Sequence, residues 1–303
     1  MYKRQISTNL ESEIAEALAE CEHDKIFVLT DETTVVKCWP VVKNYFSLKD
    51  AKVITIGATD THKDLDTMVH VWKSLGEGGA SRHSCMINLG GGMVTDLGGF
   101  AAATFKRGIN FINIPTTLLS MVDASVGGKT GINFGGLKNE IGAFADARFV
   151  IINTCFLDTL DAENLCSGYA EMLKHALISD ERMWAEHVNF DLSQPDLAEL
   201  QRMVAESIAV KERIVAEDPH EHGIRKALNF GHTIGHALEE FALQQATPSG
   251  GAVVSTAPTN QTTGGAAISP APKNRPLLHG YAVAFGLIGE LYMSARKAGF
   301  PTE

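Results

Sequence analysis

Three segments of the sequence carry acidic, basic and histidine side chains at spacings that suit a catalytic site built on helix faces. The segments are Ser167–Lys174, Leu228–His236 and Leu278–Gly280. If the second segment and the residues just before it are helical, four polar side chains form one stripe, because they lie at i, i+4, i+7 and i+11. These four are Arg225, Asn229, His232 and His236. Glu171 and Lys174 share a helix face by the same reasoning.

A carboxylate and two neutral imidazoles make a complete protein ligand set for a catalytic Zn²⁺ ion with one open position. The three segments together contain these groups, and lysine, arginine and asparagine on the same surfaces indicate an anionic, hydroxylated substrate beside the metal. The combination predicts an enzyme. Taken singly, each residue has a simpler interpretation: a solvated helix acid for Glu171, a core histidine for His232 and a helix cap for His279. His232 and His236 do not form the metalloprotease signature, because Thr233 stands where that signature has glutamate.

Composition bounds the class of protein. The chain has 303 residues, of which 45% are apolar and 20% charged, which is typical of a globular protein large enough for two domains. A net charge of −10 argues against nucleic acid or an anionic membrane as the main partner. The five cysteines show no paired spacing, and there is no signal peptide and no apolar run long enough to cross a membrane. A cytoplasmic location is therefore predicted.

The order of elements predicts an α/β part followed by an α part. Short apolar strands are expected at 25–31, 51–57, 84–89, 111–115 and 149–153, with helices at 65–75 and 96–105 between them, which predicts a parallel sheet. Longer amphipathic helices are expected at 163–179, 195–217, 226–243 and 281–298. The predicted domains are an N-terminal parallel-sheet nucleotide-binding domain, 1–157, and a C-terminal all-helical metal- and substrate-binding domain, 158–303. The stretch 247–276, rich in Thr, Ser, Ala, Gly and Pro, is expected to be a loop without a core of its own.

Two glycine-rich stretches suit phosphate groups. Gly90, Gly91 and Gly92 stand where a strand turns into a helix, although the dinucleotide fingerprint is incomplete because Thr95 replaces its third glycine. The stretch 122–131 has Asp123 where a Walker A loop needs glycine, which argues against a P-loop nucleotidase. Its paired glycines still present Lys129, and a second lysine follows at 138, as expected for a phosphorylated substrate.

Taken in order, these segments resemble the 3-dehydroquinate synthase family, a branch of the sugar-phosphate cyclases. The matching pieces are GGGMVTDLGGFAAATFKRG, INIPTTLLSMVDASVGGKTGIN, LKNEIGAF, SGYAEMLKHALI, LNFGHTIGHALE and LHGYAVAFG. The resemblance runs from about Ile26 to the C-terminus and is interrupted only by 247–276.

The resemblance implies a role for each matching position. Metal ligands, for Zn²⁺ or Co²⁺, would be Glu171, His232 and His279. The NAD site would use Asp31, Asp60, Lys63, Gly91, Gly92, Asp96, Thr116, Thr117, Lys138, Phe156 and Thr159. The substrate site would use Asp123, Lys129, Asn139, Lys174, Lys211, Arg225, Asn229 and His236. Arg107 would reach the phosphate of the substrate in the neighbouring subunit of a homodimer.

The activity implied by the resemblance is conversion of 3-deoxy-D-arabino-heptulosonate 7-phosphate to 3-dehydroquinate and phosphate, in the shikimate pathway. NAD⁺ would transiently oxidise the C5 hydroxyl, phosphate would leave, the hydride would return and an aldol closure would finish the ring, so the net outcome is that of a lyase. Three alternatives stay open: a related cyclase acting on another sugar phosphate, a metal-dependent polyol dehydrogenase, and an NAD-binding protein without activity.

The sequence departs from the family pattern at several positions. Asp60 stands where glutamate is usual, 161–164 replaces a Pro-x-Arg-Glu stretch, and Tyr281 replaces a common glutamate. The family usually continues past the position of Glu303 through helices that carry another substrate-binding lysine. From this difference, NAD⁺ binding with slow turnover is expected.

Overall fold

The structure is a computed structural model that describes residues 3–6, 9–218, 221–246 and 277–299. The predicted loop at 247–276 lies outside the described residues. By its internal contacts the chain divides into two compact units, Met1–Asn229 and Phe230–Glu303.

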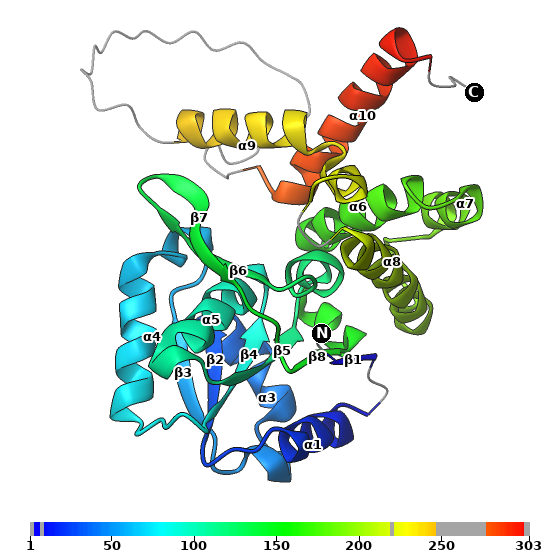
Figure 1. The fold of residues 1–303 in the computed structure, drawn as a ribbon. Helices are drawn as coiled ribbons and strands as arrows, with labels where there is room; N and C mark the ends of the chain where they lie inside the picture. The colour runs from blue at the N-terminus through cyan, green and yellow to red at the C-terminus, as the bar shows by residue number, and fades with distance from the viewer. Residues whose placement is uncertain (1–2, 7–8, 219–220, 247–276, 300–303) are drawn as a thin grey trace, which may run out of the picture. The chain divides into compact units, whose positions relative to one another are not determined.

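A six-stranded parallel sheet forms the centre of the first unit (Figure 1). In spatial order its strands are β1 (Lys3–Ile6), β8 (Phe149–Ile152), β5 (Asn110–Pro115), β4 (Cys85–Gly90), β2 (Ile26–Asp31) and β3 (Lys52–Ile56). All five predicted strands are present to within a residue or two, and β1 is the additional one. The prediction succeeds because each strand is a short apolar run bounded by turn residues.

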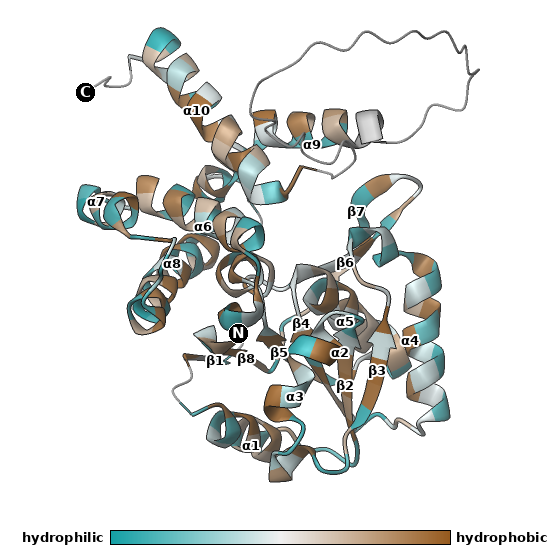
Figure 2. Cartoon of the chain, turned by 180° about the vertical axis from the view of Figure 1, so that it is seen from behind, coloured by the Kyte–Doolittle hydropathy of each residue, from teal (hydrophilic) through white to brown (hydrophobic). Residues whose placement is uncertain are grey.

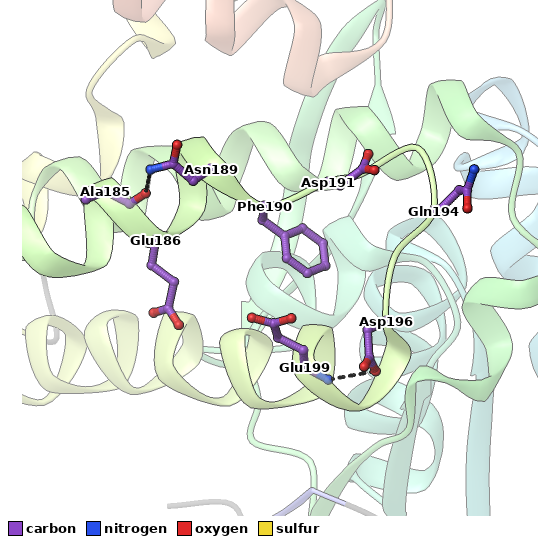
Figure 3. Close-up of a pocket in the computed structure, with 8 residues that line it drawn as sticks. All are labelled: Ala185, Glu186, Asn189, Phe190, Asp191, Gln194, Asp196 and Glu199. Atoms are coloured by element: carbon purple, nitrogen blue, oxygen red, sulfur yellow. Dashed lines mark hydrogen bonds between the residues drawn. The ribbon is translucent and has the colours of Figure 1, made fainter.

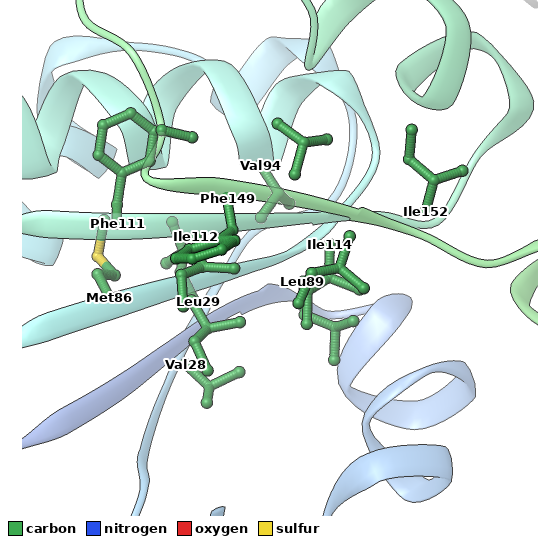
Figure 4. Close-up of a cluster of buried hydrophobic side chains, with 14 of the residues drawn as sticks. Val28, Leu29, Met86, Leu89, Val94, Phe111, Ile112, Ile114, Phe149 and Ile152 are labelled. Carbon is green, nitrogen blue, oxygen red and sulfur yellow. The ribbon is translucent and has the colours of Figure 1, made fainter. Parts of the chain in front are cut away.

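The core lies on the two faces of this sheet. Every residue of β4 is buried, which requires cover on both faces, and Figure 4 shows its Met86 and Leu89 among apolar side chains of the neighbouring strands. The helices of this part are α1 (Leu10–Glu20), α2 (Thr34–Lys37), α3 (Trp39–Val42), α4 (Leu65–Glu77) and α5 (Gly92–Thr104). In Figure 2, β2 is mostly brown, the colour of hydrophobic residues, whereas α4 and α7 alternate brown with teal.

The glycine-rich region after β5 folds into a short helix and a hairpin. A π-helix, η4 (Ser120–Ala124), precedes the antiparallel strands β6 (Lys129–Phe134) and β7 (Leu137–Phe144). From the sequence this region was expected only as phosphate-binding loops, and the hairpin is an addition. Gly135 and Gly136 join the two strands with φ of 60° and 84°, values that glycine adopts without strain.

Three longer helices complete the first unit: α6 (Ala162–Leu177), α7 (Glu181–Asn189) and α8 (Leu197–Glu217). Each begins with an aspartate whose side chain accepts a backbone N–H of the first turn, namely Asp161, Asp180 and Asp196. Asp161 belongs to the stretch that departs from the family pattern, and this capping gives it a structural role. Short 3-10 helices lie at η1 (Phe46–Leu48), η2 (Asp60–His62), η3 (Phe105–Arg107), η5 (Thr154–Thr159) and η6 (Ile224–Asn229).

The described part of the second unit contains α9 (His232–Ala246) and α10 (His279–Lys297). The predicted continuous helix at 226–243 is wrong, because η6 ends at Asn229 and α9 begins only at His232. Gly231 causes the break with a φ of 80°. A Cβ on Gly231 would lie 2.8 Å from the carbonyl oxygen of Val283, so this glycine also lets the two helices approach closely. The single stripe of Arg225, Asn229, His232 and His236 therefore does not exist: the first two residues lie in η6, and the two histidines lie in α9.

The predicted combination of a parallel-sheet part and a helical part is confirmed. The last strand of the large sheet ends at Ile152, near the predicted domain boundary at 157, whereas the compact units meet after Asn229. Helices α6, α7 and α8 thus belong to the same compact unit as the sheet, and the domains 1–157 and 158–303 stay a prediction. In the described ranges, no helix combines the length and the apolarity needed to cross a membrane.

Candidate functional site

The carboxyl ends of the central strands bring several predicted NAD residues to one edge of the sheet. Asp31 ends β2, Gly91 follows β4 and Thr116 follows β5, and in a parallel sheet these ends share an edge. A Cβ on Gly91 would lie 3.1 Å from Cγ2 of Thr117, and one on Gly92 would lie 3.1 Å from Cβ of Ala124. Gly91 is the N-cap of α5 and Gly92 its first residue, so these glycines place backbone N–H groups at a helix N-terminus, a site that favours phosphate.

A buried lysine contacts residues of both the predicted NAD site and the predicted substrate site. Lys63 is 4% exposed, and its Nζ donates to Oδ2 of Asp96 at 2.6 Å and to Oδ1 of Asn139 at 2.5 Å. Burial raises the pKa of Asp96, and the ion pair with Lys63 partly offsets this. Asn139 has a φ of 53°, so the hairpin backbone turns to present this side chain. The structure thus places Asn139, predicted for the substrate, directly against Lys63, predicted for NAD, and Lys63 also binds Asp96.

The remaining predicted NAD residues contact one another or the segment that follows β2. Lys138 lies 3.7 Å from a carboxylate oxygen of Asp60. Phe156 is fully buried, and Thr159 donates its hydroxyl to the carbonyl oxygen of Phe156 at 2.8 Å. Lys37 of α2, just after Asp31, donates to the carbonyl oxygen of Thr159 at 3.1 Å. Thr159 therefore lies beside the segment that follows β2.

Two lysines and two carboxylates form a largely buried charged cluster where η4, α6 and α8 meet. Lys174 and Glu171 are 1% and 0% exposed and form an ion pair on α6. Lys211 of α8 is 7% exposed, binds the carboxylate of Asp123, and donates to its carbonyl oxygen at 2.7 Å. Burial alone would raise the pKa of Asp123, but the charges of Lys211 and Lys174 hold it well below its usual range. Three predicted substrate residues and one predicted metal ligand are thus brought together.

His175 is a member of this cluster that the sequence analysis missed. Its ring is fully buried, with Nδ1 2.7 Å from Oγ of Ser207, and its ligand nitrogen lies within 4.8 Å of carboxylate oxygens of both Asp123 and Glu171. Burial lowers the pKa of His175 well below its ordinary value of 6.5, so the ring is neutral. The sequence could have identified His175, because it lies four positions after Glu171 on the same helix face.

The neutral state of His175 makes stability depend on pH. Well above pH 6.5 the ring is neutral in both the folded and the unfolded state. As the pH falls below that value, the unfolded chain binds a proton that the folded protein does not, so the free energy of unfolding decreases, by up to about 1.4 kcal/mol per pH unit. We expect His175→Gln to flatten this dependence in urea unfolding between pH 6.5 and 5, whereas His70→Gln, at an exposed position of α4, keeps it. An unchanged slope in His175→Gln would show that the ring is protonated when folded.

A second group of predicted substrate residues gathers around Glu221, which the sequence analysis also missed. Lys129 Nζ lies 3.2 Å from Oε2 of Glu221, and Asn229 Nδ2 donates to its other oxygen. The hydrogen bond from Asn229 is the main reason that the pKa of Glu221 is lowered, with Lys129 acting in the same direction. Glu221 has a φ of 60°, a conformation that ordinary residues rarely adopt outside constrained sites. Arg225, which follows Glu221 by four positions in the sequence, is buried, with 4% exposure.

Arg107 lies apart from these groups. It is exposed in η3 with a φ of 67°. Its predicted contact with a neighbouring subunit stays a prediction.

The second unit holds three histidines whose ring nitrogens can converge on one ion. The ligand atoms of His232, His236 and His279 lie within 4.8 Å of one another, and the ring centroids are separated by 5.3 to 5.8 Å. The structure therefore brings the predicted ligands His232 and His279 together and adds His236, predicted for the substrate. Glu171 belongs to the first unit, so the full ligand set stays a prediction.

A surface pocket of about 520 Å³ lies at α7, α8 and their connection, away from every predicted site residue (Figure 3). It is lined by Ala185, Glu186, Asn189, Phe190, Asp191, Gln194, Asp196 and Glu199. Its four carboxylates would repel an anionic substrate, and Asp196 is occupied in capping α8. We assign it no role in the chemistry.

Comparison with known proteins relates the whole chain to one family. The family model described as 3-dehydroquinate synthase N-terminal matches residues 53–167, and the model of the C-terminal part matches residues 168–258. A 3-dehydroquinate synthase of Parabacteroides distasonis is 47% identical over 298 residues, which cover 98% of this chain and 76% of that relative. One of Streptococcus pyogenes serotype M3 is 38% identical over 228 residues, covering 75% of this chain and 64%, less than two thirds, of that relative.

Among solved structures, a 2-epi-5-epi-valiolone synthase from Streptomyces hygroscopicus, with NAD⁺ and Zn²⁺ bound, has a similar fold. Its TM-score is 0.75 at 26% identity, over 98% of this chain and 76% of that protein.

Proposed function

Because the chain belongs to the 3-dehydroquinate synthase family, we propose that it converts 3-deoxy-D-arabino-heptulosonate 7-phosphate to 3-dehydroquinate and phosphate. The observation that carries this proposal within the structure is the buried cluster of Asp123, Glu171, Lys174 and Lys211. Burying charged groups costs free energy of desolvation, so a buried cluster of lysines and carboxylates indicates a role in recognition or catalysis. A phosphorylated sugar acid is the kind of substrate that such ammonium groups bind.

The ammonium groups of the cluster can still donate hydrogen bonds to a ligand. A lysine has three donors, and Lys211 uses two of them on the main-chain and side-chain oxygens of Asp123. Lys174 is held by Glu171, the predicted metal ligand. When Glu171 turns toward a cation, Lys174 can donate to an anionic oxygen of the substrate instead. We assign Lys174, Lys211 and Arg225 to the negative oxygens of the substrate, and Lys129, Asn139 and Arg107 to its phosphate.

The three imidazoles of the second unit fit a zinc ion, since zinc prefers nitrogen and carboxylate ligands in a tetrahedral set. His232, His279 and Glu171 would hold it, and the ion would act as a Lewis acid toward substrate hydroxyls. Asn229 and His236 would hydrogen-bond the sugar oxygens, and a neutral His236 can accept or return a proton.

The residues at the edge of the sheet fit NAD⁺. Gly91 and Gly92 would present backbone N–H groups of the α5 N-terminus to the pyrophosphate, with the side chain of Thr117 beside Gly91. NAD⁺ would supply reversible hydride acceptance, so the reaction has no net redox change. Lys63 orients Asp96 and Asn139 where the proposed cofactor residues and substrate residues meet. A cytoplasmic homodimer, with Arg107 contributed across its interface, completes the proposal.

The substrate can be tested with a panel of sugar phosphates. We expect cyclisation of 3-deoxy-D-arabino-heptulosonate 7-phosphate and no product from sedoheptulose 7-phosphate or glucose 6-phosphate, because Asn229 and His236 follow the dehydroquinate synthase pattern. Product formation is measured by chromatography with mass detection. Preferential turnover of either other sugar would assign the chain to a related cyclase activity instead.

A further inference from the structure

We propose that Glu239 is a positioning residue that sets the tautomer and the orientation of His279 toward the metal ion. Oε2 of Glu239 lies 3.1 Å from Nδ1 of His279. The proposal rests on the proposed function, in which His279 is a metal ligand.

The hydrogen bond fixes which ring nitrogen is available. With Glu239 ionised, its carboxylate only accepts hydrogen bonds, so Nδ1 of His279 carries the proton and donates a hydrogen bond to Glu239. Nε2 of His279 then keeps its lone pair for a metal ion. A carboxylate behind a ligating histidine also increases the basicity of the ligand. His279 is the first residue of α10, where the backbone restricts the ring less than within a helix, and the contact with Glu239 restrains it.

Burial shows that Glu239 is not an ordinary surface acid. It is 7% exposed in the middle of α9, where the helix N-terminus offers no stabilisation. It follows His232 by seven positions and His236 by three, so all three share the face of α9 that meets His279. The carboxyl group of Glu239 thus lies on the histidine-bearing face of α9, where it would stabilise a bound cation.

A second carboxylate links α10 to the start of α9. Oε2 of Glu290, on α10, accepts the backbone N–H of Gly231 at 2.8 Å, and its Oε1 lies 3.4 Å from the backbone nitrogen of Ile234. Glu290 therefore binds the start of α9, where His232 is the first residue. Because α9 and α10 are fixed to each other in this way, the distance from Glu239 to His279 is a stable feature of the unit.

The test measures metal affinity and does not depend on turnover. Metal-free parent protein, Glu239→Ala, Glu239→Gln and Glu240→Ala are titrated with Zn²⁺ against a chromogenic chelator, and the Co²⁺ absorption spectra are compared. Glu240 is the matched control, since it is adjacent on α9 but exposed. We expect Glu239→Ala to bind Zn²⁺ about 10 to 100 times more weakly and to alter the Co²⁺ spectrum. Glu239→Gln should lose less, since its amide oxygen still accepts from Nδ1, and Glu240→Ala should match the parent.

The outcomes separate the possibilities. Affinity of Glu239→Ala within about twofold of the parent overturns the proposal. So does an equal loss in both Glu239 variants together with a lower melting temperature of the metal-free protein, since that result indicates packing and not ligand orientation. If the parent itself binds no Zn²⁺, the metal-dependent function fails as well. A parent that binds Zn²⁺ while Glu239→Ala binds it equally well refutes only the role of Glu239.

Discussion

Replacing Lys174 by methionine is expected to lower the free energy of unfolding of the metal-free protein by about 3–5 kcal/mol. Lys174 and Glu171 are 1% and 0% exposed and form an ion pair one helical turn apart on α6. Methionine fills a similar volume but leaves the carboxylate of Glu171 buried without its cation. The loss of the partner, and not the loss of packing, causes the effect. Urea unfolding followed by circular dichroism measures it.

A double variant separates these causes. Glu171→Gln with Lys174→Met removes both charges, so it should cost less than Lys174→Met alone. Lys3→Met is the control, since the ion pair of Lys3 with Glu20 is 63% and 53% exposed, and little change is expected there. If Lys174→Met were as well tolerated as Lys3→Met, the buried ion pair of Lys174 with Glu171 would contribute little to stability.

Removal of the metal is expected to abolish turnover, and added Zn²⁺ or Co²⁺ should restore it. Lewis-acid stabilisation contributes several kcal/mol to the transition state, so His232→Ala and His279→Ala should each lower kcat/KM by about 1,000-fold or more. Both variants should also lose bound zinc, measured by elemental analysis. Full activity in metal-free protein would refute the metal assignment.

His236 provides the sharper comparison, because its ring lies with the other two histidines in the structure. If it binds substrate, as the family resemblance implies, His236→Ala keeps zinc and loses turnover. Loss of zinc in His236→Ala would make it a ligand and would replace the predicted set. His70→Ala, exposed on α4, should change neither quantity.

The parts of the fold that follow from local sequence could be predicted. The strands β2, β4 and β5 are apolar runs with turn residues at their ends, and the structure has them at the expected places. The helix through Arg225 and His236 failed because a single glycine, Gly231, adopts a positive φ that apolar periodicity does not reveal. The hairpin of β6 and β7 was missed because its glycines and lysines looked like a loop.

The site could be predicted only in part, because its contacts join distant positions in the sequence. Lys63 meets Asn139, and Lys211 meets Asp123, 76 and 88 positions apart. The resemblance supplied the residue types, but it did not show that these groups pair with one another. Glu221 was missed for the same reason. Glu239 and His175, in contrast, lie on the same helix faces as His232 and Glu171, and their spacing alone could have identified them.

The most direct test of the account is the stoichiometry of NAD⁺ in the reaction with 3-deoxy-D-arabino-heptulosonate 7-phosphate. The protein, loaded with Zn²⁺, is given substrate in large excess over NAD⁺, and phosphate, carbocyclic product and NADH are measured together. Since the hydride taken from the substrate is returned to it, we predict many molecules of phosphate and dehydroquinate, in equal amounts, for each NAD⁺ present, with no accumulation of NADH. NADH that rises in step with substrate consumption, without release of phosphate, would contradict the synthase assignment and would identify a dehydrogenase.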